Sequence, residues 1–189
     1  IKLVKDQPGI HVPDDSAALL LIEVDGLETE MPNAIKQITS AAHNSSLLEI
    51  HHSDSVDDAK KLWATRKALS PALRGIAPNK LNEDVVVPIA NIPALLQGLQ
   101  KLSEKHGIPI VNFGHAGNGN IHVNLLYDTQ NAEQSVQAMP CLSGIFKLVL
   151  DLDGTLSGEH GIGTEKKDYI VLEIDQVSLN WMKKLKTLF

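Results

Sequence analysis

The chain has 189 residues, of which 43% are hydrophobic and 21% are charged. This ordinary globular composition excludes a wholly disordered, collagen-like or coiled-coil chain. The single cysteine, Cys141, excludes an intrachain disulfide scaffold, and the net charge of −6 argues against a nucleic-acid binder. The apolar run at residues 17–22 is far shorter than the ~20 residues of a membrane span, and no signal peptide is visible. We therefore expect a cytoplasmic protein, with membrane association left open.

The first part of the chain is expected to contain both strands and helices. Hydrophobic patterns predict a strand over residues 17–24, a helix over residues 30–43 and a short strand over residues 47–51. Ser55, with Asp58 three residues later, resembles a capping box and predicts that a second helix begins there. We expect this helix to end at about Leu69, because Pro71 follows.

The remaining pattern predicts a sheet with helices packed on it. We expect strands at 84–88, 108–113 and 121–127 and helices at 92–106, 132–152 and 176–189. Gly107 is placed to end the first of these helices, and residues 153–167 form a glycine-rich loop. The prediction is an α+β fold with ferredoxin-like split βαβ units, in which a mostly antiparallel sheet carries helices on one face.

Two histidines flank the glycine-rich turn between the strands at 108–113 and 121–127. If the Asn-Gly pair at residues 118–119 forms a two-residue hairpin turn, His115 and His122 lie directly opposite each other. Opposed side chains of this kind have Cβ atoms about 4.5–5.5 Å apart, so two imidazoles can converge on one metal ion. The alternative is a surface hairpin whose histidines are incidental.

The loop at residues 153–167 adds an adjacent glutamate and histidine between glycines. Glu159 is a candidate third ligand beside His115 and His122, because three protein ligands with an open position are typical of a catalytic metal site. His160 is a candidate general base, since its unperturbed pKa is near neutrality. The alternative is a flexible surface loop with an incidental Glu-His pair.

One arginine shares the apolar face of the helix predicted to begin at Ser55. Arg66 follows Leu62 by four residues and Trp63 by three, so it points with that face. A bound carboxylate is a candidate partner, because the guanidinium group matches it in two parallel hydrogen bonds. The alternatives are an internal salt bridge and a side chain that extends to solvent.

Trp63 and Trp181 are expected to anchor the core.

Four segments of the sequence resemble a known family. They are FGHAGNGNIH, GTLSGEHGIGTEKK, LWATRKALSPAL and EDVVVP. In their order along the chain, with LWATRKALSPAL first and EDVVVP second, they are similar to the C-terminal domain of FAD-linked oxidases, a family that includes D-lactate dehydrogenase, the glycolate oxidase FAD subunit and D-2-hydroxyglutarate dehydrogenase. The resemblance runs from about Leu20 to Phe189. It departs at Asn118, where the family usually has Asp, and a hairpin turn accepts either residue.

The resemblance implies that residues 1–189 are the substrate- and metal-binding domain of a larger flavoprotein. The flavin would be bound mainly by an N-terminal domain outside this sequence, so the chain alone is expected to be an inactive fragment or a processed product. The implied metal is Zn, Mn or Fe. The residues that match the family's site are His115, His122 and Glu159 as metal ligands, His160 as the base, and Arg66 and Asn124 at the substrate.

The resemblance also implies the substrate class. Family members that act on dicarboxylic hydroxy acids carry a lysine at the position of Asn82, so this sequence favours a small 2-hydroxy acid such as lactate or glycolate. The expected partners are that substrate and the FAD domain, with the electron acceptor unidentified and a homodimer as a candidate assembly. Two other functions stay open on sequence grounds, namely a stand-alone metallohydrolase and a non-catalytic metal-binding module.

Overall fold

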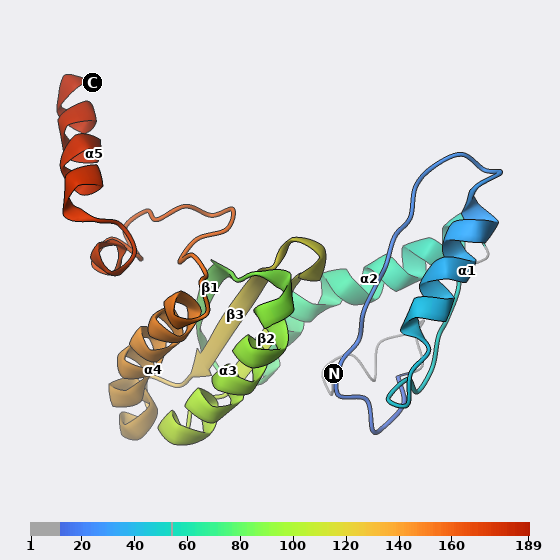
Figure 1. Ribbon diagram of the computed structural model, residues 1–189. Helices are drawn as coiled ribbons and strands as arrows, with labels where there is room; N and C mark the ends of the chain where they lie inside the picture. The colour runs from blue at the N-terminus through green and yellow to red at the C-terminus, as the bar shows by residue number, and fades with distance from the viewer. Residues whose placement is uncertain (1–11, 54) are drawn as a thin grey trace. The chain divides into compact units, whose positions relative to one another are not determined.

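The computed structural model describes residues 12–53 and 55–189, and the chain divides into two compact units. The N-terminal unit, residues 1–74, contains helices α1 (Met31–Ala42) and α2 (Val56–Ala72) (Figure 1). The C-terminal unit, residues 75–189, contains the sheet. Its elements are β1 (Asn79–Val86), α3 (Ile92–His106), β2 (Ile110–His115), β3 (Asn120–Tyr127), α4 (Ala132–Asp151) and α5 (Gln176–Leu188).

The N-terminal unit confirms the two predicted helices and contradicts the two predicted strands. Residues 17–24 and 47–51 have no strand structure, because no described segment of the unit pairs with them, and β-forming residues alone do not make a strand. Helix α2 begins as predicted, with the Ser55 hydroxyl accepting a hydrogen bond from the Asp58 amide. It runs through Pro71, because a proline in the last turn removes only one amide hydrogen bond.

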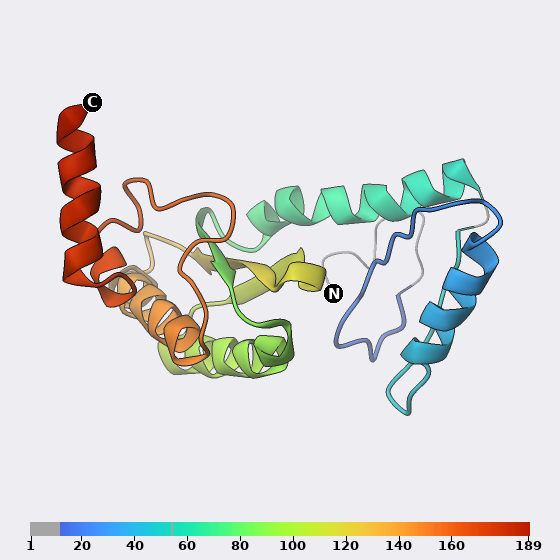
Figure 2. The ribbon, with the colours of Figure 1, turned by 45° about the horizontal axis from the view of Figure 1, so that its top comes forward.

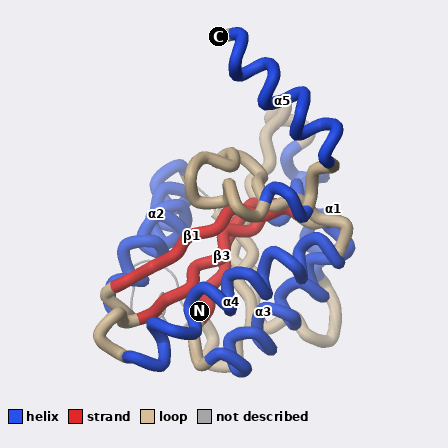
Figure 3. The backbone as a smooth tube through the Cα atoms, turned by 90° about the vertical axis from the view of Figure 1, so that its left-hand side faces the viewer, coloured by secondary structure: helices blue, strands red, loops and turns tan. Residues whose placement is uncertain are grey.

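The sheet of the C-terminal unit has the strand order β1-β3-β2, and β3 is antiparallel to both neighbours (red in Figure 3). Strands β1 and β2 are therefore parallel to each other, joined by α3 and separated by β3. This arrangement is a split βαβ unit. Helices α3 and α4 lie together on one face of the sheet (Figure 1). The predicted α+β class is confirmed.

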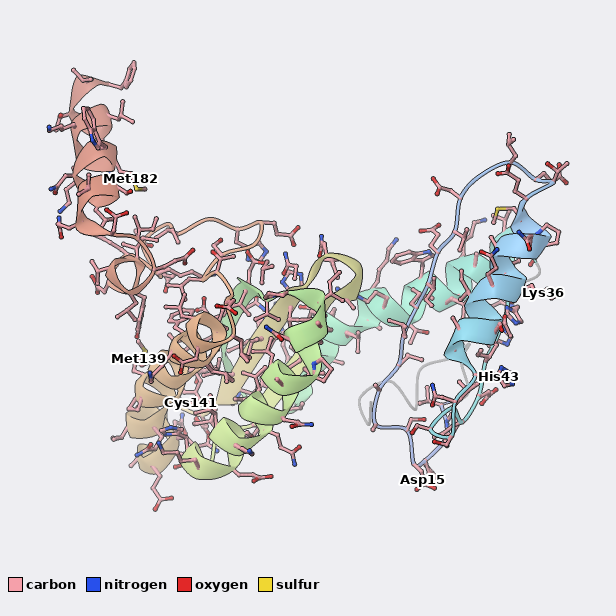
Figure 4. All side chains as sticks on the ribbon, viewed as in Figure 1. Asp15, Lys36, His43, Met139, Cys141 and Met182 are labelled. Atoms are coloured by element: carbon pink, nitrogen blue, oxygen red, sulfur yellow. The ribbon has the colours of Figure 1, made fainter. Side chains whose placement is uncertain are left out.

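The core lies between the sheet and these two helices. Alternate residues of β3 point into it, namely Ile121, Val123 and Leu125. Leu95 and Leu99 of α3 meet them there, along with Cys141 of α4, whose place on that helix is labelled in Figure 4. Cys141 is a buried free thiol, and burial raises its pKa to about 11, so it is not a reactive cysteine.

The expectation that both tryptophans anchor the core is wrong. Trp63 on α2 is 38% exposed and Trp181 on α5 is 61% exposed. Neither side chain belongs to the buried core of the described residues. Among the described residues, no helix combines the length and the apolar character needed to cross a membrane.

Between α4 and α5 the chain is irregular over residues 152–175, apart from a short 3-10 turn at Ile170–Leu172 (Figure 2). This stretch begins by pairing with β1, where Val86 and Thr155 exchange two backbone hydrogen bonds of 2.8 and 3.1 Å. Because of this pairing, the glycine-rich loop lies next to β1 of the sheet. Glu159 and His160 therefore lie beside β1 and the β2–β3 hairpin, although they are far from both in sequence.

Candidate metal centre

The hairpin that carries the two histidines has a different register from the predicted one. His115 lies opposite Asn120, and His122 lies opposite Phe113, so the pairing differs by two residues from the turn predicted at residues 118–119. An even shift leaves every side chain on its predicted face of the sheet. His115 and His122 are consequently diagonal neighbours, and their ring centroids are 5.5 Å apart.

A contact outside the hairpin accounts for the change of register. Residues 116–119 form a four-residue loop in place of the predicted two-residue turn. The Gly119 carbonyl accepts a hydrogen bond of 3.1 Å from the Val87 amide, which extends the pairing of β1 beyond the end of β3. This contact with β1 stabilises the four-residue loop. The preference of an Asn-Gly pair for a two-residue turn considers the hairpin alone, so it cannot predict a contact with β1.

The structure brings three candidate ligands together. Nε2 of His122 is 3.4 Å from Oε1 of Glu159, and Nε2 of His115 is 3.9 Å from the same oxygen. One nitrogen or oxygen atom from each of the three residues lies within 4.8 Å of the others. His122 forms the buried floor of the cluster, whereas His115 and Glu159 are each about half exposed. The cluster is therefore open on one side.

His160 completes the cluster as its fourth member. Its ring stacks on His122 with centroids 5.4 Å apart, and its Nε2 lies 3.9 Å from Oε1 of Glu159. Burial, followed by the neighbouring His115 and His160, lowers the pKa of His122, although Asp84 and Glu159 oppose this effect. His122 is therefore neutral at neutral pH, which is the form that binds a metal ion.

Asp84 on β1 is a site residue that the sequence analysis missed. Its buried carboxylate oxygen Oδ2 accepts hydrogen bonds from the backbone amides of Gly158, Glu159 and His160, at 2.9, 2.7 and 2.8 Å. Burial alone would raise the pKa of Asp84, but these hydrogen bonds outweigh it and lower the pKa to about 2. A Cβ at residue 158 would lie 2.5 Å from the side-chain Nδ2 of Asn120, so any larger residue there would require Asn120 to move.

Lys166 is a second missed residue, at the far end of the same loop. Its buried ammonium group donates to the carbonyls of Leu156 and Asp84 at 2.6 and 2.8 Å, and lies 3.5 Å from Oε2 of Glu83. Glu83 is also buried, and burial raises its pKa against the opposing effect of Lys166. A signal for Lys166 exists in the sequence, because Glu83 interrupts the apolar positions Leu81 and Val85 of β1, and a buried carboxylate needs a cation as partner.

Asn124 lies on the same face of the sheet as His122, as the alternation predicts, but it is fully buried. Its side-chain oxygen accepts a hydrogen bond of 2.7 Å from Asn82, and its nitrogen donates to the backbone carbonyls of Val111 and His122. The Asn124 amide thus links all three strands. Asn82 covers it and is the exposed member of the pair.

Arg66 lies on α2 in the N-terminal unit, where its side chain is partly buried and has interactions of its own. The helical prediction for its surroundings is confirmed. The metal cluster belongs to the C-terminal unit, whereas Arg66 belongs to the N-terminal unit. Its assignment to the substrate carboxylate stays a prediction.

The donor set fits a divalent metal ion. Two imidazoles and one carboxylate are ligands that zinc, manganese and iron accept. Atoms bound to one zinc ion at tetrahedral angles lie about 3.3 Å apart, close to the 3.4 Å that separates His122 and Glu159. His115 reaches the same position with a small movement of its exposed side chain. Three ligands and an open side are the pattern of a catalytic site.

The fold is thus α+β, and its candidate metal ligands lie at one end of the three-stranded sheet, with His122 on the central strand β3. The family model for FAD linked oxidases, C-terminal domain, matches residues 1–189. The chain belongs to this family.

Named relatives agree with this membership. The chain is 28% identical over 187 residues to the glycolate oxidase subunit GlcD of Bacillus subtilis, covering 99% of this chain and 40% of the relative. It is 30% identical over 175 residues to the mitochondrial D-lactate dehydrogenase [cytochrome] of Arabidopsis thaliana, covering 90% and 30%. It is 29% identical over 141 residues to the D-2-hydroxyglutarate dehydrogenase of Stutzerimonas stutzeri, covering 72% and 30%. The chain therefore spans 40% or less of the length of these relatives.

Proposed function

We propose that residues 1–189 form the substrate- and metal-binding domain of an FAD-dependent oxidoreductase that oxidises the α-hydroxyl group of a D-2-hydroxy acid. The observation that carries the proposal is the convergence of His115, His122, Glu159 and His160 on one open cluster. The chain belongs to the FAD linked oxidase family, so the electron acceptor in this proposal is FAD. The flavin is bound by a segment outside this sequence, in the part of the relatives that the chain does not match.

Within the cluster the four residues have different tasks. His115, His122 and Glu159 hold a divalent ion, which when bound polarises the substrate hydroxyl and lowers its pKa. His160, whose ring is half exposed beside these ligands, accepts the hydroxyl proton at a ring nitrogen. A flavin held beside this cluster would supply the two-electron acceptor for the hydride on the same carbon, as the alcohol becomes a ketone or aldehyde.

In this proposal, residues outside the metal cluster orient the substrate. Arg66 binds the substrate carboxylate in the proposal, because its planar guanidinium group fixes a carboxylate by two parallel hydrogen bonds. Asn124 faces the substrate side of the sheet and acts through Asn82, which it holds by a hydrogen bond of 2.7 Å. A neutral residue at position 82 favours a small substrate such as D-lactate or glycolate, which has one carboxylate.

The proposal is tested by replacing His160 with asparagine in the complete flavin-loaded protein. Reduction of the flavin by D-lactate or glycolate is followed anaerobically by its absorbance. Loss of the base is expected to slow this reduction about 10²–10⁴-fold while the flavin content is unchanged. His106→Asn is the matched control, because His106 lies at the end of α3 and bonds to Gln137 at 2.7 Å, away from the cluster.

Two results would contradict the proposal. Flavin reduction by the His160→Asn protein at the wild-type rate would remove His160 from the role of base. Ester or peptide hydrolysis that a chelator abolishes, in a protein that shows no hydroxy-acid-dependent flavin reduction, would favour a metallohydrolase that uses the same His115, His122 and Glu159 ligands.

A further inference from the structure

The backbone of the loop that carries Glu159 and His160 is bound to one buried carboxylate. Three consecutive amides, of residues 158, 159 and 160, converge on Oδ2 of Asp84 at 2.7–2.9 Å. The Ser157 hydroxyl lies 3.5 Å from the same oxygen. Successive amides that point at one centre form an anion-binding concavity, and here a side chain from β1 occupies it.

Asp84 also contacts the other end of the loop. Its backbone carbonyl accepts a hydrogen bond of 2.8 Å from the Lys166 ammonium group, and Lys166 donates to the Leu156 carbonyl as well. Both ends of the segment 156–166 are therefore attached to one residue of β1. The side chains of Glu159 and His160 are about half exposed, so packing around them does not determine where the backbone lies.

We propose that Asp84 is a positioning residue that fixes the backbone of residues 158–160, so that Glu159 and His160 reach the cluster before a metal ion or a substrate binds. Asp84 acts through these two residues, because three backbone amides take up its Oδ2. Asp84 is also not among the side chains that lie close enough together to share an ion, which are His115, His122 and Glu159. The inference rests on the proposed function only for the roles given to Glu159 and His160. The hydrogen bonds themselves do not depend on that function.

Amide hydrogen exchange in the chelator-treated full chain tests the positioning without any metal or substrate. The measured quantity is the exchange rate of the peptide that contains residues 157–166, by mass spectrometry. We expect the amides of residues 158–160 to be protected in the wild type, although their residues are exposed. Asp84→Asn is expected to speed their exchange at least tenfold, because hydrogen bonds to a charged group are lost. Wild-type amides that exchange as fast as an open loop would overturn the proposal.

Metal affinity shows whether the position of the loop backbone affects how tightly the proposed ligands bind a metal ion. Binding of Zn²⁺ and Mn²⁺ to the full chain is measured for the wild type, Asp84→Asn and Asp84→Glu. Asp84→Glu keeps the charge and moves the carboxylate, so a loss of affinity in both variants separates position from charge. The expected loss is about 10–100-fold, as for other residues that orient metal ligands. Asp151→Asn, the same charge change at an exposed position on α4, is the control and should leave affinity unchanged.

The two arms separate failure of this inference from failure of the proposed function. A wild-type chain that binds neither ion contradicts the metal role of Glu159, and the exchange experiment still decides whether Asp84 holds the loop. Unchanged metal affinity in both Asp84 variants of a chain that binds metal would overturn the positioning role, even with altered exchange. Because the wild-type exchange measurement uses no variant, it decides the question even where Asp84→Asn fails to fold.

Discussion

Replacing Lys166 with methionine removes the positive member of a buried ion pair and keeps a side chain of similar length. The wild-type ammonium group makes two hydrogen bonds to backbone carbonyls and lies 3.5 Å from the Glu83 carboxylate. The two side chains are only 5% and 6% exposed, so water cannot replace the lost partner. The variant therefore leaves a buried carboxylate without a counter-ion.

The cost depends on pH, because Glu83 can escape its buried charge by taking up a proton. Burial raises the pKa of Glu83 above its ordinary value of 4.5, and loss of Lys166 raises it further. Protonating an ordinary glutamate costs about 3 kcal/mol at pH 7 and less than about 1 kcal/mol at pH 5, and the wild type already bears part of this cost because the pKa of Glu83 is raised. The two carbonyls that lose their donor add about 1–2 kcal/mol at either pH. We expect a loss of at most about 5 kcal/mol at pH 7 and a smaller loss, of at most about 2 kcal/mol, at pH 5.

Urea denaturation at both pH values measures the difference in free energy of unfolding between Lys166→Met and the wild type. The double variant Glu83→Leu with Lys166→Met is expected to recover about 3 kcal/mol at pH 7, because no uncompensated charge is then left. Lys147→Met is the control, since Lys147 pairs with Asp151 on an exposed helix face and should cost less than about 1 kcal/mol. A Lys166→Met loss that is equal at the two pH values would refute the reasoning.

Three further predictions follow from close contacts and from the lowered pKa values. Gly114→Ala places a Cβ 2.3 Å from the Asn120 carbonyl oxygen, so it should lower the free energy of unfolding by about 1–3 kcal/mol, measured by thermal unfolding. In the control Gly117→Ala the new Cβ meets nothing within 4 Å, so the loss of stability should be smaller. Equal losses in the two variants would contradict this prediction. Because the pKa of Asp84 falls from 3.8 to about 2 on folding, Asp84 contributes about 2 kcal/mol of stability above pH 4, and this is lost as the pH falls through about 2. Asp84→Asn should flatten that part of the urea-derived stability profile, and an unchanged profile would exclude Asp84 as its source. Folding lowers the pKa of His122, so the metal-free chain has its full stability above pH 6.5 and loses part of it as the pH falls below 6.5. His122→Gln should therefore reduce the pH dependence of the free energy of unfolding below pH 6.5.

Local patterns in the sequence predict the helices of the C-terminal unit well. The apolar spacing of α3 and the glycine that follows it give the bounds Ile92–His106, and Gly107 adopts the left-handed conformation expected of a residue that ends a helix. The choice of face for the polar residues of β3 is also right, because it depends only on strand alternation. These features need no knowledge of distant residues.

Features that depend on distant residues are those that the sequence analysis misplaces or misses. The hairpin register depends on the Val87 amide bonding to Gly119, and the loop conformation depends on Asp84 and Lys166. These contacts join residues that are 32, 76 and 82 positions apart in the chain, so no local rule contains them. Clustering of His115 with His122 survives the register error because the shift is even.

Metal content tests the central claim most directly, since the proposal places a divalent ion on His115, His122 and Glu159 in a flavin-dependent oxidation. The measurement is moles of metal per mole of flavin in the complete protein, for the wild type, His122→Ala and the control His106→Ala. We expect about one ion per flavin in the wild type and the control. In His122→Ala we expect loss of both the ion and the D-lactate- or glycolate-dependent reduction of the flavin. Full activity in a wild-type protein without a stoichiometric ion would contradict it.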